Sequence, residues 1–200
     1  MTVQIRPAGE TDAAALAALA AVTFPLACPP TTTPESIADF IARHLTEGRF
    51  AEYLADPDRT LLVAIPDAAT EAGAALGASP EIAATGGLVG WSMLIETEGG
   101  EPSDADAAAA VSARPAIELS KMYAHPAAHG SGIAGELMRA TIEEAARGEA
   151  SVVWLGVNQE NARAIRFYEK HGFAIVGRKR FLVGDRWEHD YVLERSLLVE

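Results

Sequence analysis

The segment 117–173 constrains this chain most, because it places a glycine-rich turn between a strand pattern and a helix pattern. It runs IELSKMYAHPAAHGSGIAGELMRATIEEAARGEASVVWLGVNQENARAIRFYEKHGF, and a second strand–helix unit follows the first. Small residues in such a turn let backbone N–H groups approach an anion, and the start of the following helix adds positive potential. The segment therefore predicts a cradle for a phosphate-bearing cofactor.

Two familiar phosphate loops do not fit this turn. A P-loop needs a Gly-Lys-Ser/Thr sequence, and no lysine follows the glycines here. Gly130, Gly132 and Gly135 have the spacing of a dinucleotide-binding fingerprint, but the strand before them ends in the run 123–126, Tyr-Ala-His-Pro. The glycine spacing alone does not choose between a cofactor loop and a plain tight turn.

Length and charge limit the class of protein. A chain of 200 residues, 49% of them hydrophobic, is long enough for one domain with a sizeable core. Its formal net charge of −12 argues against nucleic acid or an anionic membrane as a partner, because both attract clustered Lys and Arg. The same charge weakly favours cationic small molecules.

The N-terminal region and the cysteine content indicate a cytoplasmic protein. The first residues lack the pattern of a signal peptide, and the apolar run 13–22 is short for a bilayer span. The single cysteine, Cys28, excludes an internal disulfide, and its surroundings predict an inert thiol.

Apolar periodicity predicts an α/β (α+β) fold with a mixed sheet flanked by helices. Strands are expected at 3–6, 60–65, 87–95, 117–124, 152–157, 173–183 and 187–197, with Gly184-Asp185 as a hairpin turn. Helices are expected at about 11–22, 34–45, 50–56, 131–147 and 160–171. Residues 24–33 and 66–85 are expected to be loops.

Residues 97–115 stand out by composition. They are acidic and rich in Ala and Gly, with almost nothing to bury, and are expected to form an exposed insertion. Neither flank forms a domain alone, so the chain is expected to be a single domain over residues 1–200.

Two motifs resemble the GCN5-related N-acetyltransferases. The first is the strand end at 119–126 with the following H-G-S-G-I-A, in which the family pattern Arg/Gln-x-x-Gly-x-Gly/Ala falls on His129, Gly132 and Ala134. The second is NARAIRFYEKHGF at 161–173, which is similar to the family's next motif. The resemblance covers essentially the whole chain. Residues 23–50 and the ending GDRWEHDYVLERSL also resemble the bacterial PaiA-type polyamine acetyltransferases.

The resemblance implies a mostly antiparallel, twisted sheet whose fourth and fifth strands splay apart, with acetyl-CoA as co-substrate and no metal. The cofactor-binding candidates are Met122, Tyr123 and Ala124 at the strand end, His129, Gly130, Ser131, Gly132, Ile133, Ala134 and Gly135 in the turn, and Asn161 and Lys170 on the second helix. Main-chain groups are expected to serve at the strand end and in the turn. Asn161 has a plain helix-start residue as its alternative, and Lys170 a solvated lysine.

His129 departs from the family pattern, which has Arg or Gln at that position. A histidine can donate a hydrogen bond to a pyrophosphate, but it is only partly charged at neutral pH. The departure affects the side-chain contribution to binding and leaves the main-chain contribution intact.

Tyr168 and Glu118 are the candidate catalytic residues. By spacing alone Tyr168 fits a core aromatic, whereas the resemblance makes it the general acid for the departing thiolate. Strand alternation places Glu118 on the same face as Met122, so it is a candidate base. A carboxylate that only binds substrate, or one that is solvated, is the alternative, and His125 and His171 are alternative bases.

These features predict an N-acetyltransferase that moves an acetyl group from acetyl-CoA to a primary amine. The acceptor is expected to be a small molecule such as a polyamine, or a peptide or protein N-terminus. A non-catalytic acyl-CoA-binding sensor is the alternative, although it has no need of the Tyr168 hydroxyl, and a Rossmann-type nucleotide enzyme is a third. The sequence leaves the acceptor, the role of 97–115 and the oligomeric state open, with a homodimer among the alternatives.

Overall fold

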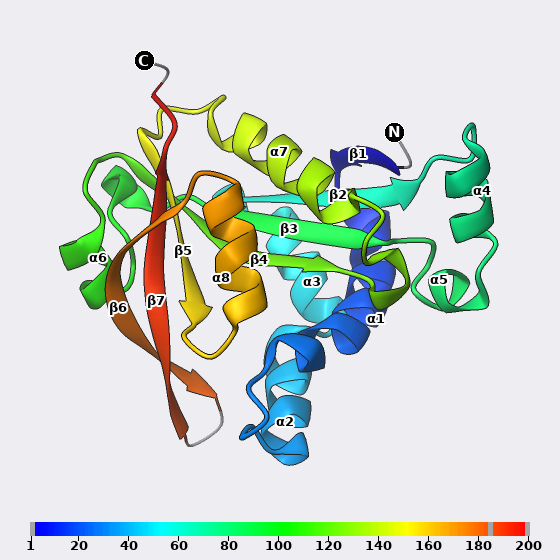
Figure 1. Cartoon of the computed structure of the whole chain (residues 1–200), viewed down its shortest axis with the longest axis horizontal. Coiled ribbons are helices and arrows are strands. Elements are labelled where there is room, and N and C mark those ends of the chain that lie inside the picture. The colour runs from blue at the N-terminus through cyan, green and yellow to red at the C-terminus, as the bar shows by residue number, and fades with distance from the viewer. Residues whose placement is uncertain (1–2, 184–185, 199–200) are drawn as a thin grey trace.

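A seven-stranded sheet, in the order β1-β2-β3-β4-β5-β7-β6, forms the centre of the molecule (Figure 1). The computed structural model describes residues 3–183 and 186–198. All neighbouring strands are antiparallel except β4 and β5, which are parallel. The predicted mixed, mostly antiparallel sheet is therefore confirmed.

The strands lie close to their predicted positions, and the hairpin turn Gly184-Asp185 falls outside the described residues. Their bounds are β1 Val3–Pro7, β2 Arg59–Pro66, β3 Gly90–Ile95, β4 Ala116–Ala124, β5 Val152–Asn158, β6 Ala174–Val183 and β7 Arg186–Ser196.

The helices are α1 Ala13–Thr23, α2 Pro34–His44, α3 Glu47–Ala55, α4 Glu71–Gly77, α5 Pro80–Ala84, α6 Ala105–Ala110, α7 Ile133–Ala145 and α8 Ala162–Lys170. Polar side chains fix several helix starts: Thr46 and Asn161 each accept a hydrogen bond from a first-turn N–H group. Helix α7 begins two residues later than predicted, because Gly132 has a φ of +87°, which no residue within an α-helix has.

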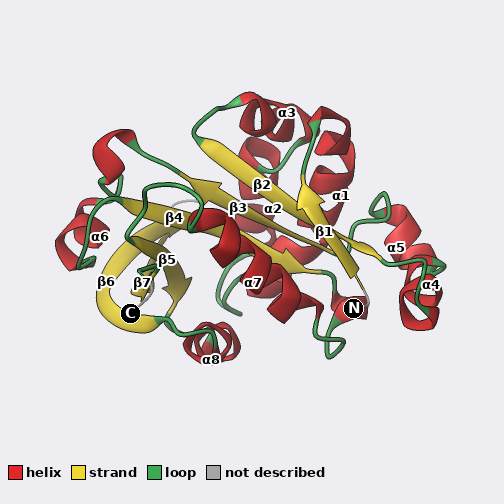
Figure 2. Cartoon of the chain, turned by 90° about the horizontal axis from the view of Figure 1, so that it is seen from above, coloured by secondary structure: helices red, strands yellow, loops and turns green. Residues whose placement is uncertain are grey.

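Two layers of helices cover the sheet. Figure 2 shows α1–α3 on one face and α7 and α8 on the other. On the first face, Leu16, Leu19 and Phe50 are fully buried and pack in one cluster with Trp91 of β3. The segment Glu10–Ala27 is long and apolar enough to cross a membrane by length and composition, with a mean hydropathy of 1.3, and 39% of it is buried inside the structure.

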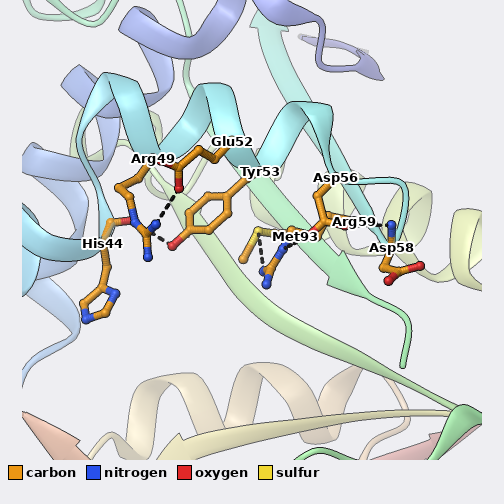
Figure 3. A network of polar contacts seen from close by, with 8 residues as sticks. All are labelled: His44, Arg49, Glu52, Tyr53, Asp56, Asp58, Arg59 and Met93. Carbon is orange, nitrogen blue, oxygen red and sulfur yellow. Dashed lines mark hydrogen bonds and ion pairs between the residues drawn. The ribbon is translucent and has the colours of Figure 1, made fainter. Parts of the chain in front are cut away.

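Polar contacts join α3 to the strands beneath it (Figure 3). Arg59 of β2 donates from Nε to Asp56 at 2.8 Å, and the Tyr53 hydroxyl donates to the His44 carbonyl at 3.2 Å. These contacts hold α3 against the edge of β2 and beside the end of α2.

The prediction of a loop over 66–85 is wrong for two short helices, α4 and α5. Ile82 of α5 is fully buried and packs with Ala64, Val89 and Ile133. Only Leu76 and Ile82 are large apolar residues in this Ala- and Gly-rich stretch. That is too few to produce a helical period in the sequence.

The prediction that 97–115 has almost nothing to bury is also wrong, because α6 packs on the sheet. Ala107 and Val111 are buried in one cluster with Trp154 of β5. Asp104 accepts a hydrogen bond from Lys179 of β6 at 3.3 Å. Small side chains let α6 approach the sheet closely, so a composition that suggested exposure instead permits tight packing.

Strands β4 and β5 pair over only three positions, Ala116–Val152, Ile117–Val153 and Glu118–Trp154. Beyond them, β4 continues beside β3 to Ala124 while β5 continues beside β7 to Asn158. Within the described residues, the β5-facing edge of β4 therefore lacks a strand partner over 119–124. This confirms the predicted splay.

A bulge in β4 accompanies the splay. Met93 of β3 pairs with Lys121 and Leu94 pairs with Leu119, so Ser120 is an extra residue. An extra residue reverses which face the later side chains point to. Ile117, Leu119 and Met122 accordingly share one core cluster.

Gly177 tests the packing of α6 against β6. A methyl group at this position would overlap the Ala110 side chain, so we expect Gly177→Ala to lower the free energy of unfolding by about 1–3 kcal/mol in urea denaturation. The control is Gly48→Ala at the exposed start of α3, where an added methyl meets no atom within 4 Å. Equal stability of Gly177→Ala and the wild-type protein would contradict this packing.

Candidate functional site

Two adjoining cavities lie where β4 and β5 separate. The turn-side cavity, of about 190 Å³, lies between the end of β4, the turn before α7, and α8. The strand-side cavity, of about 180 Å³, lies between β4, β5, β7 and the segment 24–29. Six residues line both: Ala27, Met122, Tyr123, Asn161, Ala164 and Tyr168. The cavities are therefore neighbours with a shared wall.

The structure brings many of the predicted cofactor residues together. Those that line the turn-side cavity are Met122, Tyr123, Ala124, His129, Ala134 and Asn161. The side chain of Ile133 is instead fully buried in the core, so only its main chain could contribute. Gly132 and Gly135 line a separate cavity of about 520 Å³ with Arg139 and Arg195.

The turn itself depends on glycine. Gly130 has a φ of +81° and Gly132 a φ of +87°, a left-handed backbone that other residues adopt only with strain. The Ser131 hydroxyl donates to the Ala128 carbonyl at 2.5 Å, which closes the turn. The first N–H groups of α7 have no acceptor within the helix, so the turn presents main-chain donors to an anion.

Arg163 is a functional candidate that the sequence reasoning missed. It is exposed in the first turn of α8 and lines the turn-side cavity. Desolvation lowers the pKa of His129 and the nearby Arg163 charge lowers it further, so His129 is mainly neutral at pH 7. A cation in the first turn of a helix lies near the positive end of the helix dipole, which is unfavourable. This unfavourable position was the signal in the sequence from which Arg163 could have been identified as a candidate.

Tyr168 lines both cavities. Its ring packs edge-on against Phe167 and Phe173, with centroids 5.6 and 5.8 Å apart. Burial raises the pKa of its hydroxyl to about 12, so this group stays protonated at neutral pH. A packed ring thus holds a proton donor at the junction of the two cavities.

Asn161 and Lys170 differ in their surroundings. The Asn161 side chain accepts a hydrogen bond from the Ala164 N–H at 3.0 Å, so it caps α8 as well as lining both cavities. Lys170 is exposed at the far end of the same helix, and it is not among the described residues that line either cavity.

The structure places Glu118 away from the expected face of β4. The bulge at Ser120 breaks the alternation, so Glu118 does not share a face with Met122. Burial raises the pKa of Glu118, while Lys121 and Lys179 act to lower it. Glu118 is not among the described residues lining the two cavities, and the face predicted from alternation was wrong.

Two carboxylates of β7 line the strand-side cavity instead. Glu188 and Asp190 are each 7% exposed. Burial raises the pKa of Asp190 to about 6, with Lys179 acting against this rise. The sequence carried a signal for them, because Glu188 and Asp190 have the same strand phase as the buried Val192.

Comparison with known proteins gives the family. The family model described as Acetyltransferase (GNAT) family matches residues 38–173. The chain is 44% identical over 188 residues to an uncharacterised N-acetyltransferase of Mycobacterium tuberculosis. The alignment covers 94% of this chain and 99% of that protein.

Solved structures share the fold. PaiA N-acetyltransferase from Thermoplasma acidophilum, in complex with coenzyme A, aligns with a TM-score of 0.67 at 16% identity, over 98% of this chain and 99% of that chain. The ribosomal-protein-S18-alanine N-acetyltransferase from Escherichia coli aligns with a TM-score of 0.63 at 14% identity, over 99% and 96%. The chain belongs to the GNAT family of acetyltransferases.

Proposed function

We propose that this protein transfers an acetyl group from acetyl-CoA to a primary amine. The observation that carries the proposal is the position of Tyr168 in the wall shared by the two cavities. One cavity borders a turn suited to phosphates, and the other holds buried carboxylates suited to an amine. Family membership supports the reaction class, and the similar PaiA protein was solved with coenzyme A.

The residues present fit coenzyme A. The edge of β4 over 119–124 has no strand partner toward β5 in the described structure, and can pair with the amide groups of an extended pantetheine arm. Main-chain N–H groups of 130–135 would hold the pyrophosphate. When bound, acetyl-CoA supplies a thioester acetyl group at the end of that arm.

Arg163 supplies the cationic side chain that the turn lacks. Because His129 is mainly neutral, its ring adds little charge to a pyrophosphate site. The Arg163 guanidinium lies beside that ring and lines the same cavity. An arginine keeps its charge at all relevant pH values and donates to phosphate oxygens.

Tyr168 acts as the general acid. Its hydroxyl is protonated at neutral pH and protonates the departing thiolate of coenzyme A. The acceptor amine enters through the strand-side cavity, which is large enough for an aminoalkyl end or a peptide N-terminus. A sensor that only bound acyl-CoA would need neither the second cavity nor the hydroxyl, so the enzyme is favoured.

An acceptor panel tests the function directly. We expect thiol release from acetyl-CoA to rise when primary amines are added, with polyamines, aminoalkyl compounds and short peptides as the arms of the panel. A thiol-reactive dye measures the release. Acetyl-CoA binding without amine-dependent release in any arm would favour the sensor.

Replacing Tyr168 by Phe removes the proton donor and keeps the packed ring. We expect kcat to fall about 10²–10⁴-fold with a smaller change in KM for acetyl-CoA. The control is Tyr53→Phe, which removes a hydroxyl bonded to the His44 carbonyl; Tyr53 is not among the described residues that line either cavity. In the wild-type protein, a pKa of about 12 predicts no loss of kcat from Tyr168 deprotonation up to pH 10. A Tyr168→Phe enzyme with unchanged kcat would remove the acid role.

Arg163 is tested against a neighbour on the same helix. We expect Arg163→Met to raise KM for acetyl-CoA about 10-fold, because the variant loses one charge-assisted hydrogen bond to the cofactor. We expect kcat to change little. Arg166→Met is the matched control, because Arg166 is exposed on α8 and does not line the turn-side cavity in the described structure. Equal KM values for the two variants would refute the contact.

A further inference from the structure

The interior of the strand-side cavity is formed around Asp190 and Gly156. In the β5–β7 ladder, Asn158 pairs with Asp190 and Gly156 pairs with Val192. Asp190 therefore lies two residues along β7 from the partner of Gly156. Gly156 is exposed although its neighbours in β5 are buried. A methyl group there would overlap Lys179 and lie 3.3 Å from Asp190 Oδ2. The missing side chain therefore lets the Lys179 chain lie against β5, next to the Asp190 carboxylate.

The charges around Asp190 come from several elements. Lys179 of β6 faces it and is itself bonded to Asp104 at 3.3 Å, while Glu188 and His189 precede it on β7. Lys121 of β4 also lines the cavity, and burial lowers its pKa. Carboxylates thus outnumber the cations near the cavity, which favours an incoming ammonium group.

We propose that Asp190 is the catalytic base: it receives the acceptor as an ammonium ion and takes its proton. The inference rests on the proposed function and deepens it. It states that the acceptors are amines that enter the strand-side cavity in their cationic form. Two observations carry it, namely the buried Asp190 carboxylate in the wall of the strand-side cavity and the position of Tyr168, the proposed general acid, in the wall of the same cavity.

The protons balance over one turnover. The ammonium gives its first proton to the Asp190 carboxylate, and the neutral amine attacks the thioester carbonyl carbon. The C–N bond forms, the C–S bond breaks, and Tyr168 gives its proton to the sulfur. The second proton of the acylated nitrogen returns to the Tyr168 phenolate through solvent, and Asp190 releases its proton to solvent. The net products are an acetamide, free thiol and one proton.

The pKa of Asp190 suits this role. Burial raises this pKa to about 6. A general base is most effective when its pKa lies close to the pH at which the enzyme works, and this value is close to neutrality. Below that pH the carboxyl is protonated and cannot accept a proton, so kcat/KM for the amine falls as pH decreases through about 6. Glu118, the base expected from the sequence, lies outside the described lining of both cavities.

The pH dependence of two Asp190 variants tests the assignment, with the best amine of the panel as substrate. We expect Asp190→Asn to lower kcat/KM for the amine about 10²–10⁴-fold at pH 7.5 and to abolish the decline near pH 6. KM for acetyl-CoA should stay within 2-fold, a readout of folding at the turn-side cavity. Asp190→Glu should restore part of the activity and shift the decline along the pH axis.

The controls separate the outcomes. Asp106→Asn removes an exposed carboxylate of α6 and should leave rate and pH profile unchanged. An Asp190→Asn or Asp190→Glu enzyme whose kcat/KM has the wild-type pH dependence overturns the assignment. A Glu118→Gln enzyme that loses the decline near pH 6 also overturns it. A wild-type protein that acetylates no amine overturns the proposed function and this inference together, whereas normal wild-type activity with an indifferent Asp190 overturns the inference alone.

Discussion

The early separation of β4 and β5 is the constraint on which the rest of the site depends. Three paired positions hold the strands together, and β3 and β7 then draw them apart. The separation leaves unpaired main-chain groups on β4 and opens space on both sides of them. The turn before α7 borders one side, and β7 the other. Tyr168 can lie in both cavity walls only because α8 spans this opening.

The sequence was sufficient for the positions of the strands and, through the family resemblance, for a mostly antiparallel sheet with splayed fourth and fifth strands. The structure confirms both in its described part. Local patterns failed where packing at a distance decides. The bulge at Ser120 is set by the register against β3, so alternation along β4 misplaced Glu118. Likewise, α6 is held by burial of Ala107 and Val111, which composition does not reveal.

The site residues divide in the same way. The candidates at the strand end, Met122, Tyr123 and Ala124, do line the turn-side cavity, and their cofactor roles stay predictions. Arg163 and Asp190 were not singled out, because the neighbours that make each of them a candidate come from other elements. A buried carboxylate costs stability unless it is compensated, and Asp190 is partly compensated by Lys179, its partner across the β6–β7 ladder. Residues that break local rules in this manner are the ones to examine first for function.

The bond between Asp104 and Lys179 joins the 97–115 segment to the electrostatics of the cavity. Asp104 precedes α6, outside the strand-side wall, yet its charge acts on Asp190 directly and through Lys179. Ala107 and Val111 of the same segment are buried against the sheet, so the segment is bound to the fold by packing and to the cavity by charge. Because Asp104 acts to raise the pKa of Asp190, a neutral residue at position 104 would lower that pKa without touching the cavity wall.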